Sequence, residues 1–187
     1  MAQRDYEKAA QRFLFAARRT TKGLKLVKER IEWEADNAPE ILPGSEIKVR
    51  VLDSDKSTDI DYYVYELARL EDIGKSVIKV FGKPPELVDA QATFDRAIPL
   101  LRKARNPLTH PNDNNEMEGF MWFSSLLMHD GYGNPQALVD PRYGQHDAAM
   151  AYSKALTDFL SGVIQLAIEQ DPPQSLAKQI SERNARW

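Results

Sequence analysis

The stretch DYEKAAQRFLFAARRTTKGLKLVKERIEWEAD, from Asp5 to Asp36, decides the helical character of the chain. Its apolar residues recur at steps of three and four positions, the spacing that places side chains on one face of an α-helix. The pattern therefore predicts one long amphipathic helix, with an apolar face of Tyr6, Ala10, Phe13, Ala17, Leu24, Val27 and Ile31.

Much of the remaining surface of this predicted helix is basic. The cations are Arg18, Arg19, Lys22, Lys25 and Lys28. Two interpretations of them are open. They form a solvated helix face, or they form a surface that guides an RNA backbone or meets a partner.

Three further segments show the same periodicity and predict helices over Ile60 to Phe81, Glu86 to Arg105 and Gln145 to Glu169. Asp59 is a suitable N-cap for the first of them. Pro99 falls inside the second, where a missing backbone hydrogen bond should bend the helix. These patterns predict helices joined by short connections.

Two segments break the helical pattern. Between residues 37 and 59 the sequence IKVRV alternates apolar and charged residues, so residues 47–51 form a short edge strand or part of an exposed loop. Residues 120–128 and 137–139 look extended, with HDGYGNPQ between them as a turn. We therefore expect a small β-hairpin, spanning about residues 118–141, inserted before the last long helix.

The predicted hairpin is rich in aromatic residues. Such side chains either pack within a hairpin or stack on unpaired bases, and the sequence leaves both open. They are Phe120, Trp122, Phe123, Tyr132 and Tyr143.

The predicted elements indicate an all-α bundle that carries one small β-hairpin. A length of 187 residues fits a single domain with a substantial core. We place that domain at residues 1–170 and expect residues 171–187 to form a tail or a short helix.

Composition narrows the chemistry. Cysteine is absent, which excludes disulfides, thiolate nucleophiles and cysteine-based zinc sites. The histidines are His110, His129 and His146, and we interpret the last two as surface or turn residues. Their spacing suggests no metal site, so we expect neither a metal nor another cofactor. The net charge of -3 argues against a generic binder of nucleic acid, so any contact with RNA should be local.

Membrane association is not expected. No apolar run approaches the roughly 20 residues that span a bilayer. The first residues, MAQRDYEKAAQRF, are charged and lack the apolar region of a signal peptide. We expect a cytoplasmic protein.

The stretch LLRKARNPLTHP, from Leu100 to Pro111, concentrates the residues with catalytic potential. Arg105, Asn106 and His110 stand as R-N-x-x-x-H, and the proline after Asn106 interrupts a helix there. A break at this point allows Arg105 and His110 to point into one cleft. Alternatively, the segment is a helix-to-turn junction in which Asn106 is a cap and the backbone satisfies His110.

The side chains of this stretch suit a phosphate. Arginine presents a fork of donors that fits phosphate oxygens, and histidine both takes and gives a proton near neutral pH. Asn106 can orient either partner. Arg102 and Lys103 add positive charge for substrate binding.

The R-N-x-x-x-H arrangement resembles the motif of the HEPN superfamily, helical proteins known mainly as metal-independent ribonucleases. The resemblance implies a four-to-five-helix bundle and an endoribonuclease that leaves a 2′,3′-cyclic phosphate. His110 would act as general base or acid, Arg105 would hold the scissile phosphate, and Asn106 would orient His110 or the substrate. It also implies a homodimer with the motif at its interface, and a toxin or antiviral defence role in which an antitoxin protein is a partner.

Some members of the superfamily add a polar residue from a neighbouring helix to the site, and Glu66 is the candidate here. It lies three residues from Arg69, so a surface ion pair is the other explanation. Two alternative functions are a non-catalytic HEPN-like module that binds nucleotides or a protein, and a structural protein that dimerises through its basic first helix.

Overall fold

The computed structural model describes residues 3–36, 54–99, 101, 117–122, 125–130, 135–141 and 143–170. This part of the chain is mostly helical, as the periodicity predicts, and it also contains three strands. In chain order the elements are α1 (Gln3–Asp36), α2 (Ser54–Phe81), α3 (Pro85–Ala97), β1 (Met117–Trp122), β2 (Ser125–Asp130), β3 (Pro135–Val139) and α5 (Gln145–Gln170).

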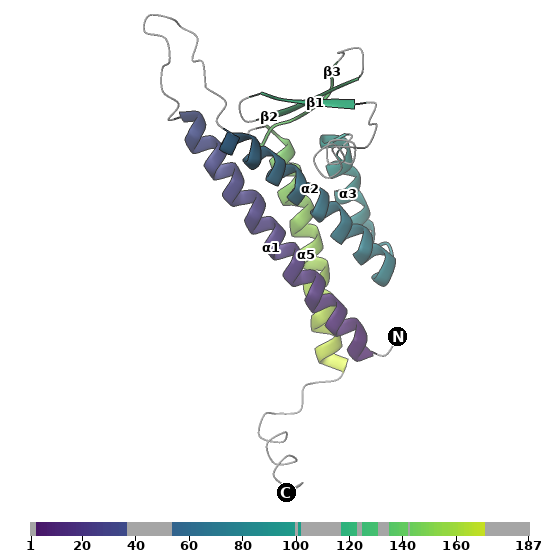
Figure 1. Cartoon of the computed structure of the whole chain (residues 1–187). Helices are drawn as coiled ribbons and strands as arrows, with labels where there is room; N and C mark the ends of the chain where they lie inside the picture. Colours follow the sequence, from purple (N-terminus) through teal and green to yellow (C-terminus); the bar gives the residue numbers. More distant parts are fainter. Residues whose placement is uncertain are drawn as a thin grey trace, which may run out of the picture.

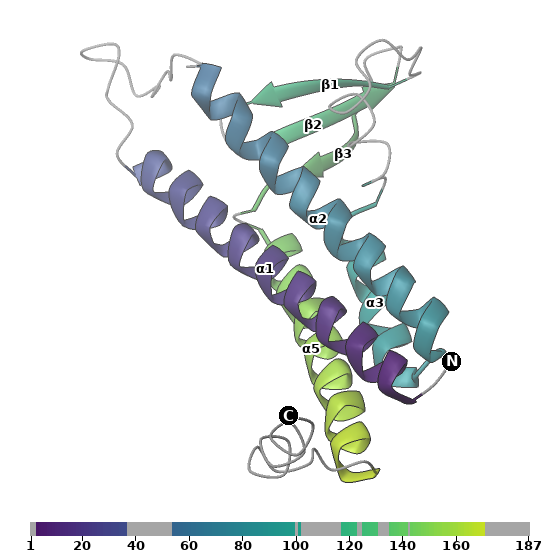
Figure 2. The ribbon, with the colours of Figure 1, turned by 60° about the horizontal axis from the view of Figure 1, so that its bottom comes forward.

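The helices form a bundle in which α1 packs against both α2 and α5, and α3 packs against α5 (Figure 1). Helix α1 runs in the opposite direction to α2 and α5, which begin at the end of the bundle where α1 finishes (Figure 2). The sheet lies near that same end.

Heptad spacing explains why α1 can bury one face along most of its length. Ala10, Ala17, Leu24 and Ile31 are seven residues apart and are all buried. Thr20 and Val27, also seven apart, are buried beside them. A seven-residue repeat keeps one seam facing its neighbours when helices pack at small crossing angles.

Helix α2 begins earlier than the sequence predicts, at Ser54. Asp59 therefore lies inside the helix, and its interpretation as an N-cap is wrong. Its carboxylate Oδ2 lies 2.7 Å from Nε of Arg30 on α1, and the Asp59 side chain is only 10% exposed. The residue that resembled a cap instead links the two helices.

Helix α3 ends at Ala97, so the predicted continuous helix from Glu86 to Arg105, bent at Pro99, is wrong at this point. Ile98 has φ −128° and ψ 67°, outside the helical region, because a residue that precedes proline avoids helical angles. Ile98 and Leu101 are nevertheless buried in the core. Their spacing in the sequence is the same as in a helix, which is why the sequence predicts that the helix continues.

The sheet is an antiparallel meander in the order β1-β2-β3. Strand β1 pairs with β2 from Met117 opposite Asp130 to Trp122 opposite Ser125. Strand β2 also pairs with β3. The segment 120–128, expected as one strand, is thus divided between β1 and β2, and the described residues of this region form three strands where the sequence predicts two.

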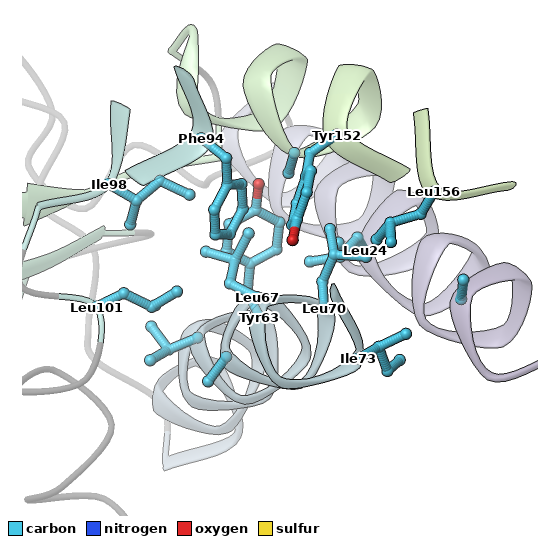
Figure 3. Packing of buried hydrophobic residues seen from close by; sticks show 14 of the residues in the cluster. Leu24, Tyr63, Leu67, Leu70, Ile73, Phe94, Ile98, Leu101, Tyr152 and Leu156 are labelled. Carbon is cyan, nitrogen blue, oxygen red and sulfur yellow. The ribbon is translucent and has the colours of Figure 1, made fainter. Parts of the chain in front are cut away.

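The core joins α1, α2, α3 and α5 (Figure 3). The rings of Phe94 on α3 and Tyr152 on α5 lie 5.1 Å apart between centroids, a distance typical of packed aromatic pairs. Tyr63 and Leu67 of α2 and Leu24 of α1 complete this layer, and each is fully buried.

Gly74 is required where α2 meets the tip of Tyr152. A β-carbon on Gly74 would lie 1.7 Å from the Tyr152 hydroxyl oxygen and 2.6 Å from its Cζ. Neither separation is possible for non-bonded atoms. Gly162, inside α5, has nothing within 4 Å of the same position.

These two helical glycines give a matched test of the core. Alanine favours a helix interior by up to about 1 kcal/mol over glycine, so Gly162→Ala should raise the free energy of unfolding by about that amount. Gly74→Ala should instead lower it by about 1–3 kcal/mol, because Tyr152 must be displaced. Urea denaturation followed by circular dichroism measures both. Equal stabilisation by the two substitutions would show that Tyr152 does not occupy this position.

Candidate functional site

The R-N-x-x-x-H motif lies outside the described residues, together with Arg102 and Lys103. Arg105, Asn106 and His110 therefore remain sequence predictions. Leu101 is the last described residue before the motif, and it is 5% exposed within the core. Covalent connection to Leu101 tethers the motif to the bundle.

Glu66 is the predicted site residue that the structure describes. It lies on α2 and is 2% exposed. The expectation that its ion pair lies at the surface is therefore wrong. Its carboxyl group faces α1 at Gly23, where an added β-carbon would lie 3.3 Å from Cδ of Glu66. Glycine at this position therefore leaves room for the acid between the helices.

The polar surroundings of Glu66 come from both helices. Nη1 of Arg69 lies 3.8 Å from Oε1, which confirms the three-residue pairing. The Tyr62 hydroxyl also hydrogen-bonds to Glu66, and this bond raises the pKa of Tyr62. Arg69 and Tyr62 are partly exposed, so the cluster extends from the interior towards the surface.

Two buried oxygens near this interface lack hydrogen-bond partners among the described residues. They are Oε2 of Glu66 and Oγ1 of Thr20, which lies one turn before Gly23 on α1. A buried polar atom without a hydrogen-bond partner costs roughly 1–3 kcal/mol. Gly23, Tyr62 and Arg69 thus surround the one predicted site residue that the structure describes, Glu66.

A second buried polar contact joins α2 to the first turn of α5. The Tyr63 hydroxyl lies 3.1 Å from Nδ1 of His146, and the two rings are stacked. His146 is 7% exposed, so its interpretation as a surface residue is wrong, although it does lie where the helix begins. Burial, followed by the charge of Lys28, lowers the pKa of His146. In the neutral tautomer with its proton on Nε2, the ring accepts a hydrogen bond from the phenol at Nδ1.

The titration of Tyr63 agrees with this assignment. Burial raises the pKa of Tyr63, and the negative charges of Asp140 and Asp147 raise it further. The phenol therefore remains a donor at all physiological pH values. We interpret the pair as a structural contact that holds the start of α5 against α2, because the two side chains form a buried hydrogen bond with each other.

Sequence reasoning identified Glu66 but missed Thr20, Gly23 and Tyr62. One local signal was present, because a glycine inside a strongly periodic helix indicates a close approach of another group. Which group approaches the glycine is decided by the tertiary packing. It requires knowledge of which turn of α2 lies opposite.

The described residues offer no obvious metal site. Within those ranges, no group of three or more histidine, aspartate or glutamate side chains is placed to hold an ion. Nor does any helix in the same part of the chain combine the length and apolar character needed to cross a membrane. Comparisons of the chain with protein-family models, with curated proteins and with solved structures give no match.

The His146 contact predicts a pH dependence of stability. Because the folded pKa is below the usual 6.5, the unfolded chain binds the proton more readily. This contribution to stability is complete above pH 6.5 and is lost as the pH falls towards the folded pKa. His146→Gln keeps an acceptor for Tyr63 without the titration, so it should lose less stability than the wild type between pH 7 and pH 5. Identical losses in urea titrations would contradict the buried neutral histidine.

Replacing Glu66 tests whether this buried carboxylate is needed for the stability of the fold. Glu66→Met removes a buried carboxylate and fills the same space with an apolar chain, so unfolding free energy should stay within about 1 kcal/mol or increase. Leu67→Ala, one residue away in the core, should cost about 2–5 kcal/mol. Thermal unfolding measures both. A loss with Glu66→Met as large as with Leu67→Ala would mean that Glu66 supports the fold.

Proposed function

We propose that the protein is a metal-independent endoribonuclease of the HEPN type, which cleaves RNA through the ribose 2′-hydroxyl and leaves a 2′,3′-cyclic phosphate. The observation that carries the proposal is the R-N-x-x-x-H sequence of Arg105, Asn106 and His110. The mostly helical bundle, to which Leu101 tethers this sequence, supports it.

The proposed chemistry uses groups suited to phosphoryl transfer without a metal. His110 removes the proton from the 2′-hydroxyl or protonates the leaving 5′-oxygen. Arg105 binds the scissile phosphate and stabilises the charge that develops on it. Asn106 orients His110 or the substrate, while Arg102 and Lys103 bind the flanking backbone.

A dimer would complete the proposed mechanism. Cleavage through the 2′-hydroxyl needs one base and one acid, and a two-fold axis at the motif would supply two copies of His110. Glu66 would then serve as a substrate-binding residue from the neighbouring helix α2. A cytoplasmic toxin controlled by an antitoxin protein, or a component of antiviral defence, is the cellular role that we propose.

A non-catalytic HEPN-like module for nucleotides or a protein is the second candidate function. In that case the same arginine and histidine would hold a phosphate without cleaving its ester.

Cleavage of mixed RNA in EDTA tests the proposal. The wild type should cut, and His110→Ala should reduce the rate by about 10²–10⁴-fold because it removes an acid–base group. His129→Ala changes a histidine of β2 that has no proposed role, so it serves as the control and should cut normally.

A second substrate tests the chemical route. An oligonucleotide with a single 2′-deoxyribose at the cut site should survive at that position. Undiminished cutting there, or by His110→Ala, would refute the proposed mechanism. Binding of RNA without cutting by any variant would favour the second candidate.

A further inference from the structure

A groove runs between α1 and α5, on a different side of α1 from Glu66. Its volume is about 470 Å³, within the range of sites for small ligands. Helix α1 contributes Arg18, Thr21 and Lys25, which lie at successive turns of one face. Helix α5 contributes the other lining residues, which are Met150, Ser153, Lys154, Thr157, Asp158 and Ser161.

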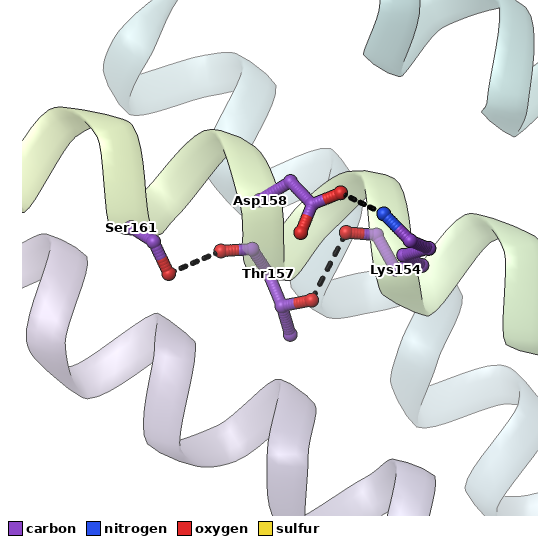
Figure 4. A network of polar contacts seen from close by, with 4 residues as sticks. All are labelled: Lys154, Thr157, Asp158 and Ser161. Carbon is purple, nitrogen blue, oxygen red and sulfur yellow. Dashed lines mark hydrogen bonds and ion pairs between the residues drawn. The ribbon is translucent and has the colours of Figure 1, made fainter.

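The charge of the groove is positive although the whole chain carries a net charge of -3. Three cations, Arg18, Lys25 and Lys154, face a single carboxylate, that of Asp158. Lys154 and Asp158 form an ion pair, but their side chains are 76% and 63% exposed (Figure 4). Exposed pairs of this kind contribute little to stability, so Lys154 can turn towards an anion at small cost.

Three hydroxyl groups of the groove donate hydrogen bonds to backbone oxygens. Thr21 donates to the backbone oxygen of Ala17 at 2.7 Å. Thr157 donates to the backbone oxygen of Lys154 at 2.9 Å, and Ser161 donates to that of Thr157 at 2.7 Å (Figure 4). A hydroxyl has one proton and two lone pairs, so the hydroxyls of Thr157 and Ser161 act towards the groove as acceptors.

Ser153 and Thr21 differ from the other two hydroxyls. Their hydroxyl groups contact each other, either can be the donor, and Ser153 is buried. The hydroxyls with lone pairs to offer to the groove are therefore those of Thr157 and Ser161, beside cations that attract negative charge.

This combination selects a particular ligand chemistry. A bare phosphate would satisfy the cations, but the hydroxyls could donate to it only by giving up their hydrogen bonds to the backbone. A ribose phosphate meets both requirements, because its phosphate pairs with arginine and lysine and its hydroxyls donate to serine and threonine. Deoxyribose within a DNA strand has no hydroxyl to donate.

We infer that the groove between α1 and α5 binds the ribose phosphate of RNA, with Arg18, Lys25 and Lys154 on the phosphates and the oxygens of Thr157 and Ser161 on the 2′-hydroxyls. The inference rests on the proposed function, since it gives that ribonuclease a second contact with its substrate.

Binding of a fluorescent ten-nucleotide oligouridylate, measured by anisotropy in EDTA, tests the charges. All variants are made in His110→Ala so that no substrate is consumed. Arg18→Ala with Lys25→Ala should weaken binding by roughly tenfold for each cation and reduce the salt slope by about 0.7 per lost phosphate contact. Arg12→Ala removes an exposed cation of α1 that does not line the groove, so it should leave both quantities unchanged.

The hydroxyl contacts have their own test. Thr157→Val with Ser161→Ala should weaken RNA binding by about fivefold per lost hydrogen bond and leave binding of the 2′-deoxy oligonucleotide unchanged. Circular dichroism confirms that each variant is folded. Competition with uridine monophosphate separates two kinds of site. A site for a free nucleotide would bind uridine monophosphate as tightly as the oligomer. A site for the RNA backbone would bind it more weakly.

Three results would overturn the inference. One is an unchanged affinity and salt slope for the Arg18 and Lys25 variant, another is equal effects of Arg12→Ala, and the third is equal binding of RNA and DNA by the parent protein. Failure of the ribonuclease proposal gives a different result. In that case the protein with an intact motif would bind RNA through the groove without cleaving it.

Discussion

The packing of α1 between α2 and α5 is the constraint on which the rest of the structure depends. Its seam uses small residues, Ala10, Ala17 and Gly23, at places where neighbouring elements approach closely. Small side chains permit this approach because a helix can come near only where its surface is not raised by bulky groups. Both candidate sites follow from it. The cluster around Glu66 lies where α1 meets α2, and the cationic groove lies where α1 meets α5.

The two sites differ in their energetic character. Glu66 and Thr20 have buried oxygens without hydrogen-bond partners in the described part of the chain, which costs stability that an apolar pair would not. The groove keeps its charges exposed and its hydroxyls satisfied by the backbone, so it adds almost no strain. A buried acid of the first kind is retained more readily for function than for stability. The groove is already formed in the free protein, so binding a ligand there requires little further ordering of side chains.

Much of the helical architecture could be predicted because amphipathic periodicity is a local property. The first helix was expected at Asp5 to Asp36 and is observed at Gln3–Asp36, and the last agrees equally well. The end of α3 was missed because Ile98 and Leu101 continue the apolar spacing beyond the break before Pro99. Core packing rather than helix continuation produced that pattern.

The candidate site could be predicted only where a single residue carries the signal. Glu66 stood out by its charge and by its spacing from Arg69, but its burial depends on Gly23 of another helix. The groove was visible in sequence only as a basic face of α1. Its hydroxyl half lies on α5, more than 120 residues later in the chain, and no local rule joins the two.

The chemical identity of the RNA ends tests the central claim most directly. Mass spectrometry of a short RNA cut by the protein in EDTA should find a 2′,3′-cyclic phosphate on one fragment and a 5′-hydroxyl on the other. These ends arise only when the 2′-oxygen attacks the neighbouring phosphate, the step assigned to His110 and Arg105. Fragments with a 3′-hydroxyl and a 5′-phosphate, or cutting that requires added magnesium, would contradict the account.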